Sequence, residues 1–237
     1  MKRPAAAPGL TPAGPVLSMF DPVHVGIDEF GHPVAIRIIY RNLLAAGEPG
    51  GGKSGLLNIL AAHVALSANT RMVLFDGKQV ELGMWDDIAD EFVGHDLDHA
   101  IITLRRLQRV MDNRYTWLRA RRRRKIEPGD HLSVITTIFD EIALYATVLG
   151  GEQDQRQFVA LLRDLVARGR AAAMPVIAAT QRPSVDIPKS LRDLFGYRAA
   201  FRCTSTGSSD IIALADYAAW TRRTQSFTTA GPAVAVA

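Results

Sequence analysis

Short apolar runs alternate along the chain with longer stretches in which apolar residues recur at helical spacing. The short runs predict strands at residues 34–39, 42–46, 71–76, 134–140, 175–180 and 197–203. Several of these runs are apolar almost throughout, which is typical of parallel strands that are covered on both faces.

Two longer segments carry apolar stripes that predict buried helix faces. One stripe runs from Leu97 to Leu118, and the other from Phe158 to Val166 with the i, i+3, i+4, i+7, i+8 pattern. Strands that alternate with helices indicate an α/β domain whose central, mainly parallel sheet is flanked by helices.

A glycine-rich segment, GEPGGGKS at residues 47–54, lies between a predicted strand and an apolar helical run and matches G-x-x-x-x-G-K-[ST]. Glycines let backbone N–H groups close around phosphate oxygens, and the helix that follows presents its positive end to them. Lys53 would reach the β- and γ-phosphates of ATP, and the Ser54 hydroxyl would bind Mg²⁺. A plain turn before a helix is the alternative, and the flanking strand and helix disfavour it. The residues predicted to line the phosphate site are Gly47, Glu48, Pro49, Gly50, Gly51, Gly52, Lys53, Ser54 and Gly55.

Two adjacent acids, Asp140 and Glu141, end the apolar run VITTIFDE. Asp140 would hold Mg²⁺ through its hydration shell. Glu141 is then placed to orient or activate the attacking water. Two exposed acids at a strand end are the alternative, but together with the phosphate segment the pair predicts ATP hydrolysis rather than binding alone.

A third run, PVIAATQRPS at residues 175–184, ends in polar residues before a turn at Pro183. Gln181 could sense the γ-phosphate from such a strand end. A strand followed by an ordinary turn accounts for the same residues equally well.

Taken together, these motifs resemble the motor domain of the FtsK/SpoIIIE family of double-stranded DNA translocases. The resemblance covers roughly residues 21–212. It is carried by the phosphate segment, FDGKQVEL (75–82), Arg114-Tyr115, Asp140-Glu141, RGRAAAMPVIAATQRPSVD (168–186) and AFRCTS (200–205).

The resemblance implies a RecA-like P-loop fold, a homo-oligomeric ring of six subunits and ATP-driven movement of duplex DNA through its centre. By resemblance, five residues form the ATP site: Lys53, Ser54, Asp140, Glu141 and Gln181. Of these, Lys53, Asp140, Glu141 and Gln181 would be catalytic, and Ser54 and Asp140 would bind the Mg²⁺. The segment at residues 25–38 is similar to that of actinobacterial mobile-element members, which favours transfer of plasmids or integrative elements over chromosome partitioning.

Several positions depart from the family pattern. Asp76 and Lys78 align with an Asp-Pro-Lys motif, but Gly77 replaces its proline. Ala173 and Pro175 stand where glycine and histidine are usual. The resemblance begins near Asp21 and fades after Ile212, so we expect the ATPase domain at residues 21–212. We expect a flexible tail at residues 1–20 and an atypical, truncated or disordered tail at residues 213–237.

Composition and the apolar pattern indicate where in the cell the protein is expected to be. No apolar run approaches the ~20 residues of a membrane helix, and the amino-terminal tail has no apolar core of a secretory signal. A single cysteine, Cys203, excludes an internal disulfide framework. We therefore expect a cytoplasmic protein without a membrane segment. We also expect no DNA-reading winged-helix domain after the predicted motor.

Charge and histidine clusters leave alternatives open. The net charge of +4 only permits contact with nucleic acid, and the basic run RARRRRK at residues 119–125 fits either DNA phosphates or a solvated helix end. His95 and His99 are spaced as metal ligands without an evident third ligand. The candidates for an arginine that acts on the ATP of a neighbouring subunit are Arg168, Arg170 and Arg202.

The leading hypothesis is an ATP-hydrolysing motor that moves along double-stranded DNA. The second is a nucleotide-binding regulatory protein that assembles with a full-length motor without hydrolysing ATP, motivated by the unusual carboxyl-terminal residues. A third is a coupling protein that acts on single strands.

Overall fold

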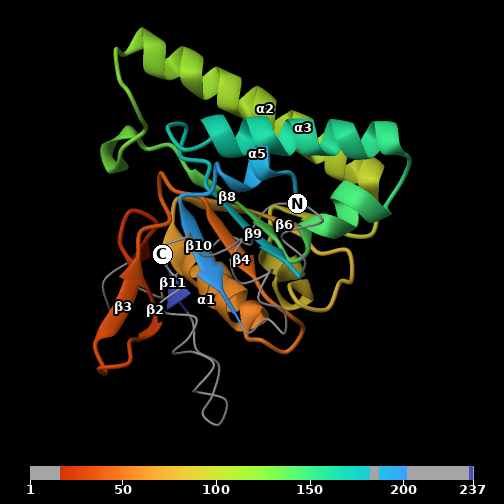
Figure 1. Ribbon diagram of the computed structural model, residues 1–237. Helices are drawn as coiled ribbons and strands as arrows, with labels where there is room; N and C mark the ends of the chain where they lie inside the picture. The colour runs from red at the N-terminus through yellow and green to blue at the C-terminus, as the bar shows by residue number, and fades with distance from the viewer. Residues whose placement is uncertain (1–16, 182–186, 202–234, 237) are drawn as a thin grey trace.

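The computed structural model describes residues 17–181, 187–201 and 235–236, and Figure 1 shows one sheet with helices on both of its faces. The strands are β1 (Leu17–Ser18), β2 (Val23–Ile27), β3 (Pro33–Ile36), β4 (Leu43–Ala46), β5 (Ser67–Ala68), β6 (Thr70–Phe75), β7 (Glu91–Val93), β8 (Val134–Phe139), β9 (Val176–Thr180), β10 (Tyr197–Ala200) and β11 (Ala235–Val236). The helices are α1 (Lys53–Leu66), α2 (Leu97–Ala120), α3 (Glu152–Arg168) and α5 (Lys189–Arg192), with 3₁₀ turns at Gly83–Ile88 and Pro128–Asp130 and a π-helical turn at Leu144–Val148.

The main sheet has the strand order β11-β10-β4-β9-β8-β6-β7. The six strands from β10 to β7 are parallel, and β11 pairs with β10 in the antiparallel sense. The predicted α/β class with a mainly parallel sheet is therefore confirmed.

The first predicted strand, at residues 34–39, lies elsewhere. Its residues Pro33–Ile36 form β3, which pairs only with β2 in an antiparallel hairpin outside the main sheet. The run continues as Ile38 and Ile39, which are buried but lie beyond the strand. The predicted strand is therefore confirmed over residues 34–36 only, and it lies outside the main sheet. The short strand β7, with three residues, was missed for want of a long apolar run.

Two apolar clusters occupy the two faces of the sheet. Helices α2 and α3 pack against each other and against one face, where the cluster includes Phe139, Leu104 and Leu162. Helix α1 covers the other face, and its Leu57 and Leu60 belong to the second cluster. Both predicted apolar stripes thus point into the first cluster, except Leu118, which lies in the second. The inner strands β4, β6, β8 and β9 are buried almost throughout, as expected for strands covered on both faces.

The folded part begins before Asp21. Leu17 and Ser18 pair with β5, and Met19 is only 2% exposed. The other predictions about the ends, and those on residues 182–186, Arg202 and Cys203, lie outside the described residues. Within the part of the chain that the structure describes, no helix is long and apolar enough to cross a membrane.

Candidate nucleotide site

Neighbouring parallel strands bring the three predicted motifs to one edge of the sheet. β4, β9 and β8 lie side by side, and each motif follows the carboxyl end of its strand. Lys53, Asp140-Glu141 and Gln181 therefore come from segments far apart in the sequence to one region. In open α/β sheets this edge is where ligands bind.

The phosphate segment connects β4 directly to α1. Its first residue, Gly47, donates its N–H to the Thr180 carbonyl at 3.3 Å, and the Phe201 N–H donates to the Ala46 carbonyl at 2.8 Å. Gly50 and Gly52 have φ angles of 74° and 104°, a region that favours glycine. The loop is thereby attached on both sides to the strands that flank β4.

Gly47 is expected to tolerate no side chain. A Cβ atom there would lie 2.6 Å from the Cβ of Phe201 and 3.1 Å from its Cα, whereas a Cβ on Gly55 would meet nothing within 4 Å. Gly47→Ala should therefore lower the free energy of unfolding by about 1–3 kcal/mol. The matched control Gly55→Ala, within α1, should leave it unchanged or raise it by up to about 1 kcal/mol. Urea unfolding of both variants makes the comparison, and equal effects would contradict the packing argument.

The Lys53 side chain folds back onto the loop that precedes it. It is 9% exposed, and its Nζ donates to the carbonyls of Gly47 at 2.5 Å and Glu48 at 3.0 Å. No side chain caps the amino end of α1, and no acid occurs in its first turn. Unsatisfied N–H groups at a helix start, beside a lysine and the Ser54 hydroxyl, form a donor set that fits the phosphates of a nucleotide.

Glu141 links the acidic pair to β9. Its Oε2 accepts the Gln181 N–H at 3.0 Å, and its Oε1 accepts the Ala143 N–H at 3.3 Å. Burial raises the pKa of Glu141 above its ordinary value, while these hydrogen bonds, one from the Thr180 side chain and the charge of Lys53 oppose the rise. A fixed, weakly solvated carboxylate near the lysine has the properties of a general base.

Asp140 is more strongly affected by its surroundings. It is 8% exposed. Burial, reinforced by the charges of Asp76, Glu81 and Glu141, raises its pKa to about 7, and Lys78 acts in the opposite direction. A buried carboxylate beside other acids is costly to ionise without a cation. The described residues bring no three potential ligands together here, so Asp140 fits the role of a single carboxylate for Mg²⁺, an ion that prefers oxygen ligands and keeps several waters.

Asp76, which the resemblance singled out, has a structural role at this edge. Its buried carboxylate accepts the N–H groups of Lys78, Gln79 and Leu82 at 3.0, 2.9 and 2.8 Å. These bonds order the loop beside Asp140. A Cβ on Gly77 would lie 1.9 Å from Leu144 Cδ2, so the packing of Leu144 explains why glycine suits this position in this chain.

An aromatic cluster that the sequence motifs did not reveal lies next to the acidic pair and includes Phe139, the residue before Asp140. Phe75 and Phe139 stack with ring centroids 4.2 Å apart, and Phe158 stacks on Tyr145 at 5.5 Å. The Tyr145 hydroxyl donates to the carbonyls of Val93 and Gly94 at 3.0 and 2.9 Å. Tyr145 lies in the π-helical turn just after Glu141, and such turns occur often at functional sites.

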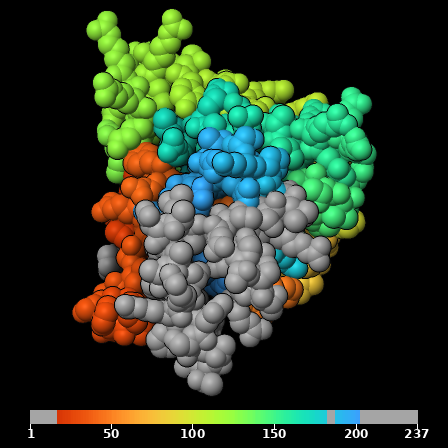
Figure 2. Space-filling view, in the orientation of Figure 1, coloured from red at the N-terminus to blue at the C-terminus, as the bar shows by residue number. Residues whose placement is uncertain are grey.

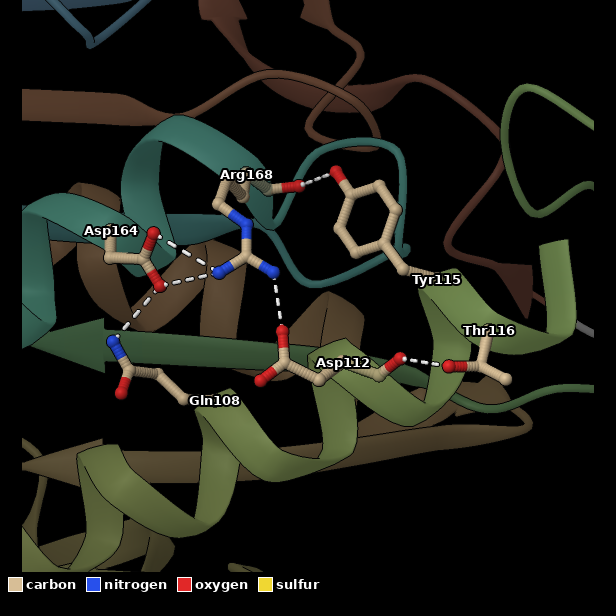
Figure 3. A network of polar contacts seen from close by, with 6 residues as sticks. All are labelled: Gln108, Asp112, Tyr115, Thr116, Asp164 and Arg168. Atoms are coloured by element: carbon tan, nitrogen blue, oxygen red, sulfur yellow. Dashed lines mark hydrogen bonds and ion pairs between the residues drawn. The ribbon is translucent and has the colours of Figure 1, made fainter. Parts of the chain in front are cut away.

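Two of the arginines proposed to act on a neighbouring subunit's ATP, Arg168 and Arg170, differ in their ion pairs. Arg168 is held between Asp112 and Asp164, and Gln108 donates to Asp164 at 3.0 Å, as Figure 3 shows. These carboxylates raise the pKa of Arg168. Arg170 is exposed and has no ion pair within the described residues, whereas Arg168 is committed inside its own subunit.

Arg114 and Tyr115 both hold the connection between α3 and β9. Arg114 is 8% exposed and donates to the carbonyls of Ala172 and Ser133, both at 2.6 Å. Burial lowers its pKa to about 10. The Tyr115 hydroxyl donates to the Arg168 carbonyl at 2.7 Å, visible in Figure 3. These two residues therefore set the conformation of the turn that carries Arg170.

The histidine pair makes no metal site. His99 Nε2 lies 2.6 Å from Glu91 Oε1, and among the described residues no three potential ligands come together around a metal position.

Comparison with known proteins places the fold and the family. The FtsK/SpoIIIE family model matches residues 18–225. DNA translocase FtsK of Haemophilus influenzae is 30% identical over 204 residues, which cover 70% of this chain and 38% of that protein. The Treponema pallidum FtsK is 30% identical over 209 residues, with 81% of this chain and 26% of that protein covered. The chain thus spans about a quarter to two fifths of the length of these relatives.

Solved structures share the fold at lower identity. The conjugation coupling protein TcpA of pCW3, solved with ATPγS, aligns with a TM-score of 0.71 and 22% identity over 81% of this chain and 57% of that one. EssC (ATPases 2 and 3) of Geobacillus thermodenitrificans aligns with a TM-score of 0.69 and 14% identity over 87% and 42%. The fold is therefore that of P-loop ATPases, and the chain belongs to the FtsK/SpoIIIE family.

Proposed function

We propose that this protein hydrolyses ATP with Mg²⁺ and uses the energy to move along double-stranded DNA as a subunit of a homo-oligomeric ring, in six copies. The observation that carries the ATPase part is the convergence of Lys53, Glu141 and Gln181, joined by the hydrogen bond from the Gln181 N–H to Glu141. The DNA part is supported by the relatives, which are named DNA translocases.

Each residue has a defined part in this proposal. The backbone of residues 47–55, in which every residue except Pro49 has an N–H group, and the Lys53 ammonium would hold the phosphates. Ser54 and Asp140 hold Mg²⁺, which would neutralise charge on the β- and γ-phosphates. Glu141 accepts the proton of the attacking water.

Gln181 couples the site to DNA in the same proposal. Its backbone is tied to Glu141, so a change at the γ-phosphate would alter the position of Glu141 and of the strand end together. Gln181 lies within ATQRPS (residues 179–184), the segment that carries the resemblance to the translocases. Arg170 and Arg202 are the candidates for acting on the ATP of the neighbouring subunit, because Arg168 is paired within its own subunit.

Displacement of a third strand from a triplex on linear duplex DNA tests movement directly. We expect displacement with ATP and Mg²⁺, and none with a non-hydrolysable ATP analogue or with a chelator. Hydrolysis that single strands stimulate more than duplex would favour a single-strand coupling protein. ATP binding without hydrolysis, by a protein that stays monomeric, would favour the regulatory alternative.

A further inference from the structure

A cleft of about 370 Å³ lies at the edge of the sheet opposite the nucleotide site. Tyr40, in its wall, precedes β4, and Ala171 precedes β9, so the cleft lies near the amino ends of strands whose carboxyl ends reach the phosphate segment. Its lining residues are Tyr40, Tyr115, Arg124, Lys125, Ala167, Arg168, Arg170 and Ala171.

Three cations of this lining have no acidic partner within the described residues. Arg124, Lys125 and Arg170 are exposed and form no ion pair there. The nearby acids Glu127 and Asp130 both pair with Arg123. The positive charge of the cleft is therefore not neutralised from within.

The walls of the cleft are held in place by hydrogen bonds. The Tyr40 hydroxyl donates to the Ile126 carbonyl at 2.5 Å, and the Ile126 N–H donates to the Ala171 carbonyl at 3.0 Å. The Lys125 ammonium lies 4.3 Å from the centre of the Tyr40 ring. The two basic segments, at the ends of α2 and α3, are thereby joined, and the site is preorganised.

The basic surface continues beyond the cleft along the end of α2. Arg119, Arg121 and Arg122 are exposed and also without an ion pair in the described part of the chain. In Figure 2 this light-green segment projects from the upper left of the molecule. A run of several exposed cations beside a basic cleft suits a ligand with many phosphates better than a single small anion.

We propose that this surface, the cleft together with residues 119–125, binds the phosphate backbone of duplex DNA. The proposal rests on the DNA motor function proposed above and adds a second contact, on the edge of the subunit that faces away from its own ATP. Its cations would fix the position of the duplex by charge and carry no sequence preference, as phosphate contacts do.

The test uses the full chain and a fluorescent 30-base-pair duplex, with affinity measured by anisotropy at several salt concentrations. Arg124→Gln combined with Lys125→Gln should weaken binding about tenfold and reduce the slope of log affinity against log salt by about 2. The control, Arg109→Gln with Arg163→Gln, removes the same charge from exposed positions of α2 and α3 outside the cleft. It should change the affinity less than threefold. Thermal melting of both variants checks that they fold.

Equal affinities of the two double variants for the duplex would overturn the proposal. An altered oligomeric state of the cleft variant, with unchanged DNA affinity, would overturn it in favour of an interface between copies. Inorganic phosphate that competes with the duplex at millimolar concentration would mark a small-anion site and also count against it. Failure of the unaltered protein to bind duplex DNA at all would instead refute the proposed motor function.

Discussion

Glu141→Gln is expected to slow ATP hydrolysis at least about 100-fold while ATP still binds, because a positioned general base contributes roughly 10²–10⁴-fold. Glutamine keeps the size of the side chain, but its single carbonyl oxygen replaces only one of the two Glu141 oxygens that accept the Gln181 and Ala143 N–H groups at 3.0 and 3.3 Å. The site should therefore keep most of its shape while it loses the proton acceptor and one of these hydrogen bonds. Single-turnover hydrolysis and titration with a fluorescent ATP analogue measure the two quantities separately.

The control for this variant is Glu152→Gln. Glu152 is an exposed acid in the first turn of α3 that pairs with Arg156 and lies outside the motifs. Its replacement should change the rate less than twofold. A Glu141→Gln protein that hydrolyses ATP at the normal rate would show that another group activates the water.

Asp140→Asn should have opposite effects on activity and on stability. Hydrolysis should fall at least about 100-fold, because a carboxylate that holds Mg²⁺ near the phosphates would be lost. Stability of the nucleotide-free protein should rise, because burial, reinforced by neighbouring acids, raises the pKa of Asp140 from its ordinary value to about 7.

The direction in which stability changes with pH follows from proton binding at Asp140. Between about pH 4 and pH 7 the folded protein holds the Asp140 proton more tightly than the unfolded chain does, so stability falls as the pH rises through this window and then levels off. Asparagine at position 140 does not ionise, so the variant does not lose this stability as the pH rises. The gain in the free energy of unfolding from Asp140→Asn should be larger at pH 8 than at pH 5, by about 2 to 3 kcal/mol.

Urea unfolding at the two pH values, without nucleotide or Mg²⁺, measures this difference. Mg²⁺ with ATP should reduce it, since a bound cation offsets the charge of Asp140. A stability gain that is equal at pH 5 and pH 8 would contradict the origin assigned to the raised pKa.

The local chemistry of the site was predictable from the sequence because three motifs each follow a strongly apolar run. Those runs became β4, β8 and β9, and parallel neighbours necessarily end at one edge. The grouping of the phosphate segment with Asp140-Glu141 and Gln181 follows from that topology. The sequence alone did not specify which strand lies between the others.

The supporting contacts were not predictable in the same way. The contact between Leu144 and Gly77 joins segments that are distant along the chain, and no local pattern encodes it. The run at residues 34–39 predicted a single strand of the main sheet because it is apolar, but β3 ends at Ile36 in a separate hairpin, and Ile38 and Ile39 are buried beyond it. The pairing of Arg168 with Asp112 similarly required the packing of α2 on α3.

The rate of ATP hydrolysis as duplex DNA is added tests the central claim most directly. With Mg²⁺ and ATP at low salt, the full chain should hydrolyse ATP, and the rate should rise several-fold to saturation with duplex DNA and fall again as salt is increased. A rate that is unchanged by duplex DNA at every concentration, in protein that binds ATP, would contradict the account of this chain as a DNA motor.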